Sequence, residues 1–490
     1  MKIYELFKNT KVSDDHVAIK FKGTEYSYKD LDSIINKYAS FFQSLGIVNG
    51  DKVALSFPNC PEYIFSFMGA SKAGAIVVPL NMMLTLEEIA YIIMESGANT
   101  IVVHPLIAQK IDKNQLSSLK LKNIIVLDDY VIEKILGMGN PKEIDIKDDD
   151  ICTYLYTSGT TGKPKGAMLT HNNFYSDVKA MDEVSDLGKY DNFLCVLPLF
   201  HSFSWTVNVL LAFYLGATVT IKENFMPKDT LDTLINEKIT VFCGVPSMFA
   251  ILMRMAEKGQ FKALRLAISG GAPLAPEIQR GFEQKFNFPL VEGYGLSEAA
   301  PVALLNPLEP DAVRKPGSIG FPLPCLEAKI VDENDNEVAV GEVGELVLKG
   351  SNIMLGYHNM PEDTAITLKN GWLHTGDLAK KDDEGYFYIV DRIKDMIILG
   401  GLNVYPREVE DALLEHPDIL EAAVIGVGDP LKGEDVKAFV VLKEGAKADR
   451  KEIQKFLKNK LAAYKIPQIF EFVSELPKNA AGKIQKKLLK

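Results

Sequence analysis

The chain has 490 residues, with 54 lysines and arginines against 65 aspartates and glutamates. A single hydrophobic core does not keep growing at this length, so we expect two or more domains. The net charge of −11 argues against a general nucleic-acid-binding protein. Five scattered cysteines, odd in number and without close pairs, form neither a disulfide framework nor a zinc ligand set. These features predict a cytoplasmic protein in a reducing compartment.

No part of the sequence predicts a membrane-spanning or secretory segment. The N-terminal residues MKIYELFKNTKVSDD lack the long apolar run of a signal peptide. The most apolar stretch, residues 205–221, is interrupted by polar side chains and predicts buried core. We expect a monomer or a homodimer.

The first half of the chain alternates strand and helix signals. Thr85 and Glu88 form a capping box that opens a helix ending at Ser96. Short apolar runs predict strands at residues 53–57, 76–79, 100–103 and 123–127. Strands separated by helix-length segments predict parallel βαβ units.

The pattern changes in the second half. Five prolines between residues 307 and 324 exclude a regular helix there, and strand-like runs follow, so residues 310–393 are expected to form a β-rich subdomain. We place a domain boundary near Lys394, which divides the chain into residues 1–393 and a smaller α+β domain, 394–490. The end of that domain is basic, with thirteen lysines and arginines against five acidic residues from Lys443 onward.

The loop from Tyr156 to Ala167, YTSGTTGKPKGA, concentrates the chemistry of phosphate binding. Its glycines let backbone N–H groups approach an anion closely, its hydroxyls add donors, and its lysines supply positive charge. The loop is not a Walker loop, because Pro164 follows Gly162-Lys163 and Thr157 stands where that pattern needs glycine. The alternative is a flexible surface loop, which seldom combines these residue types so densely.

This loop resembles the phosphate loop of the adenylate-forming (ANL) superfamily, which includes acyl-CoA synthetases, firefly luciferase and non-ribosomal adenylation domains. Later motifs recur in the order that the superfamily shows, so the resemblance covers nearly the whole chain. It implies an α/β fold in which a large N-terminal domain of βαβ subdomains and a β-rich subdomain is joined by a hinge to a small mobile α+β domain. It also implies ATP binding by Thr157, Ser158, Gly159, Thr160, Thr161, Gly162, Lys165, Gly270, Gly271, Ala272, Pro273, Tyr294, Gly295, Ser297, Asp377 and Arg392.

Four of these motifs have separate implied roles. In GYGLSE, Tyr294 resembles the residue that stacks on adenine, and Glu298 resembles the glutamate that binds Mg²⁺, a cation that favours a carboxylate together with phosphate oxygens and waters. Residues 269–273, SGGAP, resemble the other wall of the adenine site. In TGD, Asp377 resembles the acceptor of the ribose hydroxyls, for which a carboxylate is well suited. Lys165 is expected on the outer phosphates.

The remaining motifs concern the small domain. DRIKD resembles the family's hinge motif, in which Arg392 would contact the ribose or α-phosphate and Lys394 would absorb the backbone change. PKNAAGKI resembles the terminal motif, whose Lys483 would hold the acid and the α-phosphate during adenylation. Gly400 and Gly401 resemble the lining of a channel for the pantetheine arm of CoA.

The acid-binding side is assigned to PLFHSFS, where His201 is expected beside the substrate carboxylate, and to the apolar segment after it, beginning at Trp205. A core histidine is the alternative for His201. The resemblance is greatest to medium- and long-chain fatty-acid–CoA ligases, with aromatic acids close behind. The predicted enzyme uses ATP, Mg²⁺ and CoA, and its catalytic residues are Lys483, Glu298 and His201.

Two other outcomes remain open. The acyl group could pass to a carrier-protein thiol, or be oxidised as in luciferase, although no carrier domain is appended. A non-catalytic ATP-binding protein is a third class, and the presence of Glu298 and Lys483 argues against it.

Overall fold

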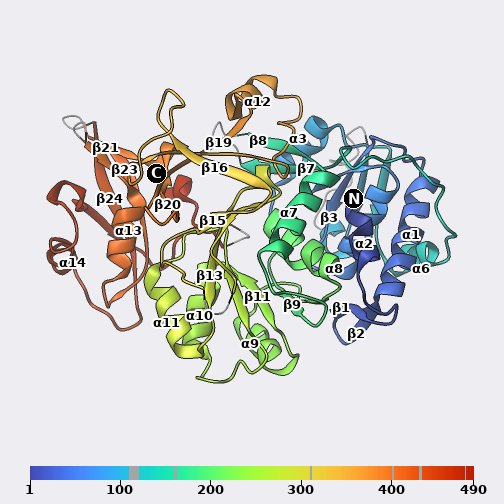
Figure 1. The fold of residues 1–490 in the computed structure, drawn as a ribbon, viewed down its shortest axis with the longest axis horizontal. Helices are drawn as coiled ribbons and strands as arrows, with labels where there is room; N and C mark the ends of the chain where they lie inside the picture. Colours follow the sequence, from blue (N-terminus) through green and yellow to red (C-terminus); the bar gives the residue numbers. More distant parts are fainter. Residues whose placement is uncertain are drawn as a thin grey trace.

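The computed structural model describes residues 1–109, 121–158, 163–309, 312–399, 402–429, 433–479 and 482–489. Within these ranges the strands form four sheets, and the C-terminal sheet with its helices lies at one end of the molecule, away from the N-terminus (Figure 1).

The first sheet has six strands in the order β6-β5-β3-β4-β7-β8, all parallel except the last pair. Its strands are β3 (Lys52–Ser56), β4 (Ile76–Pro79), β5 (Thr100–Val103), β6 (Asn123–Val126), β7 (Ile151–Ser158) and β8 (Pro164–Thr170). The helices of this region are α1 (Tyr28–Ser44), α2 (Pro61–Lys72), α3 (Leu86–Ser96), α4 (Pro105–Ala108), α6 (Asp129–Leu136) and α7 (His171–Glu183). β8 runs antiparallel to β7, so the phosphate loop connects the two strands of a hairpin.

The second sheet has nine strands in the order β15-β14-β13-β12-β11-β9-β10-β1-β2, and its central strands are parallel. Its strands are β1 (Val17–Phe21), β2 (Thr24–Ser27), β9 (Asn192–Cys195), β10 (Thr218–Ile221), β11 (Val241–Gly244), β12 (Leu266–Ser269), β13 (Leu290–Gly295), β14 (Val302–Leu305) and β15 (Phe321–Pro322). Its helices are α8 (Leu211–Leu215), α9 (Pro227–Asn236), α10 (Pro246–Met255) and α11 (Pro276–Phe286). The predicted adenine-site motifs lie where β12 and β13 end, which is where ligands bind in parallel sheets.

The third sheet is antiparallel and forms the β-rich subdomain. It consists of β16 (Leu326–Val331), β17 (Gly344–Gly350), β18 (Leu368–Lys369), β19 (Trp372–Lys381) and β20 (Phe387–Arg392), with the short helix α12 (Pro361–Thr367) before β18. The TGD motif lies within β19, and β20 leads directly into the predicted hinge.

The fourth sheet belongs to the C-terminal domain. Its strands are β21 (Ile397–Leu399), β22 (Leu402–Val404), β23 (Ile419–Asp429), β24 (Gly433–Leu442) and β25 (Ile469–Phe472), and its helices are α13 (Pro406–Leu414) and α14 (Arg450–Leu457). Apolar side chains of both helices and this sheet form a separate core cluster.

Short helical segments complete the fold. They are η1 (Ile3–Asn9), the π-helix η2 (Ser204–Leu210), η3 (Ser297–Ala299), η4 (Ile393–Asp395), η5 (Ala463–Lys465) and η6 (Lys486–Leu489).

The architecture confirms the predicted α/β fold with its β-rich subdomain and small C-terminal domain. The capping box at Thr85 and Glu88 is present, and α3 ends where the sequence predicts, at Ser96. The apolar stretch after His201 is buried core, since every residue of η2 is buried. Among the described residues, none of the helices has both the length and the apolar character needed to span a membrane.

Candidate active site

A small cavity of about 40 Å³ lies between the N-terminal domain and the end of the C-terminal domain. It is lined by Leu197, Pro198, His201, Phe203, Val245, Gly271, Asn479 and Lys483. The last two residues come from the tail of the chain, so the fold brings the predicted catalytic lysine to the predicted acid-binding side.

Lys483 lines this cavity, and both its backbone N–H and its backbone carbonyl form hydrogen bonds. Its N–H donates to Asn479 Oδ1 at 2.9 Å, and its carbonyl accepts from the Asn479 N–H at 2.9 Å. Removal of the ammonium from bulk water lowers the pKa of Lys483 to about 8, and the positive charge of Arg392 adds to this effect. The side chain is therefore still mainly protonated at pH 7, and the residue as a whole remains exposed.

His201 is a second titratable residue that lines the cavity. Burial, followed by the charge of Lys483, lowers its pKa to about 4, so the ring is neutral at physiological pH. Nδ1 accepts the backbone N–H of Phe203 at 3.2 Å, which puts the ring proton on Nε2. The imidazole thus has a fixed tautomer and can donate one hydrogen bond.

The predicted ribose and adenine residues also meet. Asp377 on β19 is buried, with its side chain 5% exposed, and its Oδ1 pairs with Arg392 Nε at 2.9 Å. The hydroxyl of Tyr294 donates to Asp377 Oδ2 at 2.5 Å. Burial, together with the Asp377 charge, raises the pKa of Tyr294, so its hydroxyl remains a donor. The structure therefore gathers three motifs that lie up to 98 positions apart in the sequence.

Glu298 lies beside the phosphate loop. Its Oε1 accepts from the hydroxyl of Tyr357 at 2.8 Å and lies 3.5 Å from Thr157 Oγ1. Ser297 next to it contacts Ser202, oxygen to oxygen, at 3.3 Å. The described residues contain no cluster of three or more His, Cys, Asp or Glu side chains that could hold a metal. A single carboxylate facing a phosphate loop fits Mg²⁺, which takes its other ligands from phosphates and water.

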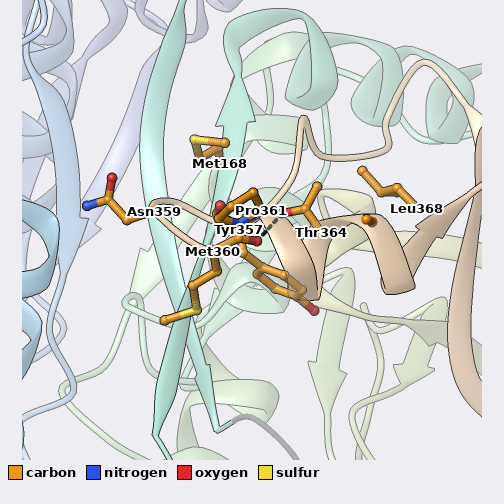
Figure 2. A pocket seen from close by; sticks show the side chains of 8 residues that line it. Met168, Tyr357, Asn359, Met360, Pro361, Thr364 and Leu368 are labelled. Atoms are coloured by element: carbon orange, nitrogen blue, oxygen red, sulfur yellow. Dashed lines mark hydrogen bonds between the residues drawn. The ribbon is translucent and has the colours of Figure 1, made fainter.

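Lys165 is buried on β8 and forms an ion pair with Asp363 of α12. Its ammonium also lies 5.3 Å from the centre of the Tyr357 ring. Figure 2 shows Tyr357 between β8 and α12, where its backbone N–H donates to Thr364 Oγ1 at 2.9 Å. The loop lysine, Tyr357 and Glu298 therefore form one connected group.

The residue that follows the SGGAP loop is hydrogen-bonded to β13, next to the predicted adenine site. Glu292 is buried, and its Oε1 accepts the N–H of Leu274 at 3.0 Å. Gly271 has a φ of +76°, which favours glycine. A Cβ at Gly295 would lie 2.0 Å from the carbonyl oxygen of Pro301, so only glycine fits there. Gly270, Ala272 and Pro273 lie in the same connection between β12 and α11.

Several predicted residues do not line the cavity. Trp205 is 2% exposed and stacks on Phe67, with ring centroids 4.2 Å apart, so the described contacts place it in the core. Lys394 is exposed on η4, directly after β20, and its role as a hinge stays a prediction. Outside the described residues lie Gly159, Thr160, Thr161, Gly162, Gly400 and Gly401, and the side chain of Ser158 is likewise not described.

Four residues at the site were given no individual role from the sequence, although Phe203 and Asn479 lie within the assigned PLFHSFS and PKNAAGKI motifs. Phe203 and Val245 line the cavity, Asn479 shapes the lysine turn, and Tyr357 contacts the predicted magnesium ligand. Phe203 lies only two positions after His201 and could have been found from that spacing. Tyr357 carries no such signal, because its contact with Glu298 joins two segments 59 positions apart in the sequence.

Models of two families match the chain. Residues 6–358 match the model described as AMP-binding enzyme, and residues 408–483 match the AMP-binding enzyme C-terminal domain. The chain belongs to the AMP-binding, adenylate-forming family.

Individual relatives agree with this assignment. A long-chain-fatty-acid–CoA ligase of Bacillus subtilis (strain 168) is 37% identical, over 97% of this chain and 91% of its own length. A feruloyl-CoA synthase of an Amycolatopsis species is 35% identical, over 98% and 96%. The chain is an AMP-forming acyl-CoA synthetase, an ATP-dependent acid–CoA ligase.

The solved structures add information about conformation. ATP-bound MatB from Rhodopseudomonas palustris superposes with a TM-score of 0.93 at 32% identity, covering 100% of this chain and 98% of that one. Apo MatB superposes with a TM-score of 0.83. The chain therefore superposes better on the ATP-bound MatB structure than on the apo one.

Proposed function

We propose that this ligase works through an acyl-adenylate, with the described arrangement serving the first step. A carboxylate oxygen of the acid attacks the α-phosphorus of ATP, and the bond to pyrophosphate breaks. The acid needs no general base, because a carboxylic acid of pKa ~4–5 is already ionised at neutral pH. The task is to hold two anions together and to stabilise the charge of the transition state. What supports this proposal most is Lys483, which lines the same cavity as His201.

The other polar groups have complementary roles in this proposal. Asp377 accepts the ribose hydroxyls, Tyr294 packs on the base, and Arg392 contacts the ribose or α-phosphate. Lys165 and the phosphate loop bind the leaving pyrophosphate. Mg²⁺ at Glu298 would supply charge neutralisation of the phosphates.

In the second step the thiol of CoA attacks the acyl carbonyl, and AMP leaves with the former carboxylate oxygen while the thiol loses its proton. We propose that the domain after Lys394 turns about the hinge between the steps, withdraws Lys483 and presents the segment at Gly400 and Gly401 to the pantetheine arm. Transfer to a carrier-protein thiol is the alternative for this step.

The acid is proposed to be a medium- or long-chain fatty acid, with aryl acids as the alternative. Apolar side chains of Leu197, Phe203 and Val245 surround the position expected for the start of its carbon chain. A fatty-acid ligase and a feruloyl-CoA synthase have nearly equal identity to the chain, and apolar pockets discriminate weakly between such acids.

An acid panel separates these possibilities. ATP–pyrophosphate exchange is measured with acids from C6 to C18 and with substituted cinnamic and benzoic acids, in the absence of CoA. Thioester formation is then measured with free CoA. Fastest exchange with C8–C18 acids and CoA-dependent thioester formation support the proposal, whereas a preference for the aromatic acids, or no thioester with free CoA, contradicts it.

The pKa of Lys483 predicts a pH dependence of adenylation. The ammonium is present below pH about 8 and is lost as the pH rises through that value. We expect kcat/KM for acyl-adenylate formation to fall about tenfold per pH unit well above pH 8, while His201, already neutral, adds no change between pH 5 and 8.

The check is the pH profile of pyrophosphate exchange for the wild type and for Lys483→Arg. Arginine stays charged, so the variant should lose the alkaline fall even where its rate is lower. If kcat/KM of the variant falls at alkaline pH as it does in the wild type, a group other than Lys483 titrates there.

A further inference from the structure

We propose that the partly buried ion pair between Lys486 and Glu410 positions Lys483 so that its side chain points to the active site. This inference rests on the proposed role of Lys483 in adenylation. The two partners are positioning residues, since their contact lies within the C-terminal domain.

The turn that carries Lys483 is short and closed by backbone hydrogen bonds. Gly482 N–H donates to the Asn479 carbonyl at 2.8 Å, and Gln485 N–H donates to the Pro477 carbonyl at 2.8 Å. Lys478 and Ile484 form a bridge across the same turn. These bonds fix the shape of the turn but leave its direction relative to the domain to other contacts.

Charged side chains at both ends of the turn fix its direction relative to the C-terminal domain. On one side Lys478 pairs with Glu421 of β23. On the other side Lys486 Nζ lies 2.6 Å from Glu410 Oε1, and the side chains of this pair are only 22% and 16% exposed. Lys486 stands three positions after Lys483, so its placement constrains the lysine directly.

Glu410 is itself fixed in place. It projects from α13, and its Oε1 also accepts the N–H of Val424 in β23 at 2.6 Å. One carboxylate therefore connects the helix, the sheet and the tail. The negative charges of Asp391 and Asp395 next to the hinge also act on Lys486, and together with Glu410 they outweigh burial and raise its pKa.

Apolar contacts alone do not fix the direction in which Lys483 points. Ile484 and Leu489 pack against the cluster formed by Ala423, Ile425, Phe439, Val441 and Leu476, which holds the tail on the sheet. Such packing is non-directional. A charge-assisted pair between partly buried groups has a defined geometry, and a misplacement of about 1 Å at a reacting centre costs about 10²-fold in rate.

The test compares Lys486→Met and Glu410→Gln with a matched control, Glu408→Gln. Glu408 lies on the same helix and pairs with Lys465 at 2.7 Å, away from the turn. Glu410→Gln keeps an oxygen for the Val424 N–H and loses only the charge. Two rates are measured for each protein with dodecanoate or, if the panel selects an aromatic acid, ferulate: formation of acyl-adenylate, and thioester formation from the synthetic acyl-adenylate and CoA.

We expect both test variants to form acyl-adenylate about 10–100-fold more slowly, with the thioester rate within about twofold of the wild type. Lys486→Arg should recover most of the loss, and Glu408→Gln should change neither rate. Equal losses in both steps would show a merely structural pair, and unchanged adenylation would show that the pair has no role; either result overturns the proposal. If the wild type itself forms no acyl-adenylate, the proposed function fails as well, so the two failures are distinguishable.

Discussion

Replacing Lys483 with alanine is expected to lower the rate of acyl-adenylate formation by about 10²–10³-fold, the cost of losing one preorganised charged donor at a reacting centre. The lysine and His201 line the same cavity, and the pKa of the lysine is lowered to about 8 by partial removal from water and by the charge of Arg392. A cation held next to the transferring phosphorus stabilises the negative charge that develops there in the transition state. Its loss should therefore affect chemistry far more than folding.

Single-turnover formation of acyl-adenylate measures this effect, and thermal unfolding monitors the fold. Lys487→Ala is the matched control, because Lys487 is an exposed lysine four residues further along the same tail. Thioester formation from synthetic acyl-adenylate should be nearly unchanged in Lys483→Ala. Acyl-adenylate formation near the wild-type rate would remove Lys483 from the mechanism.

Replacing Glu298 with glutamine is expected to lower adenylation by about 10²-fold and to raise the Mg²⁺ concentration needed for half-maximal rate. The amide keeps an oxygen that can accept from Tyr357, so the change removes charge with little change in shape. Tyr357→Phe is the complementary variant, because it removes that hydrogen bond and keeps the carboxylate.

A Mg²⁺ titration of pyrophosphate exchange separates the two variants. Glu298→Gln should strongly raise the Mg²⁺ concentration needed for half-maximal rate, and Tyr357→Phe should change it only slightly. Equal titrations for wild type and Glu298→Gln would show that this carboxylate is not the magnesium ligand.

The fold was predictable where local signals were strong. The capping box at Thr85 and the apolar runs of the first sheet correspond to observed elements, because periodicity and caps act over a few neighbouring residues. The π-helix at Ser204–Leu210 carries no such local signal, and the sequence identified only its burial. The hairpin of β7 and β8 was also missed, since the loop between its strands hides their pairing.

Residues of the candidate site were assigned from the sequence where a motif keeps them together. Asp377, Tyr294 and Arg392 were assigned separately, and the structure brings them into hydrogen-bonding distance. Contacts between distant segments could not be inferred in this way. The pairing of Lys165 with Asp363 spans 198 positions and depends on how α12 packs beside β8.

The assignment of Trp205 to the acid pocket shows the same limit. Aromatic residues close to a predicted substrate histidine could face either the ligand or the core, and composition does not distinguish the two. The stacking of Trp205 on Phe67 gives it a core partner, and Phe203 lines the cavity instead. Whether Trp205 also limits the length of the bound acid stays a prediction, which the acid panel on Trp205→Ala addresses.

The most direct measurement follows the oxygen atoms of the acid. The wild-type enzyme is given ATP, CoA and an acid whose carboxylate is labelled with ¹⁸O, and the products are analysed by mass spectrometry. Attack of the carboxylate on the α-phosphorus predicts one ¹⁸O atom in AMP and none in pyrophosphate. Label in inorganic phosphate with release of ADP, or AMP without label, would contradict an acyl-adenylate made at this site.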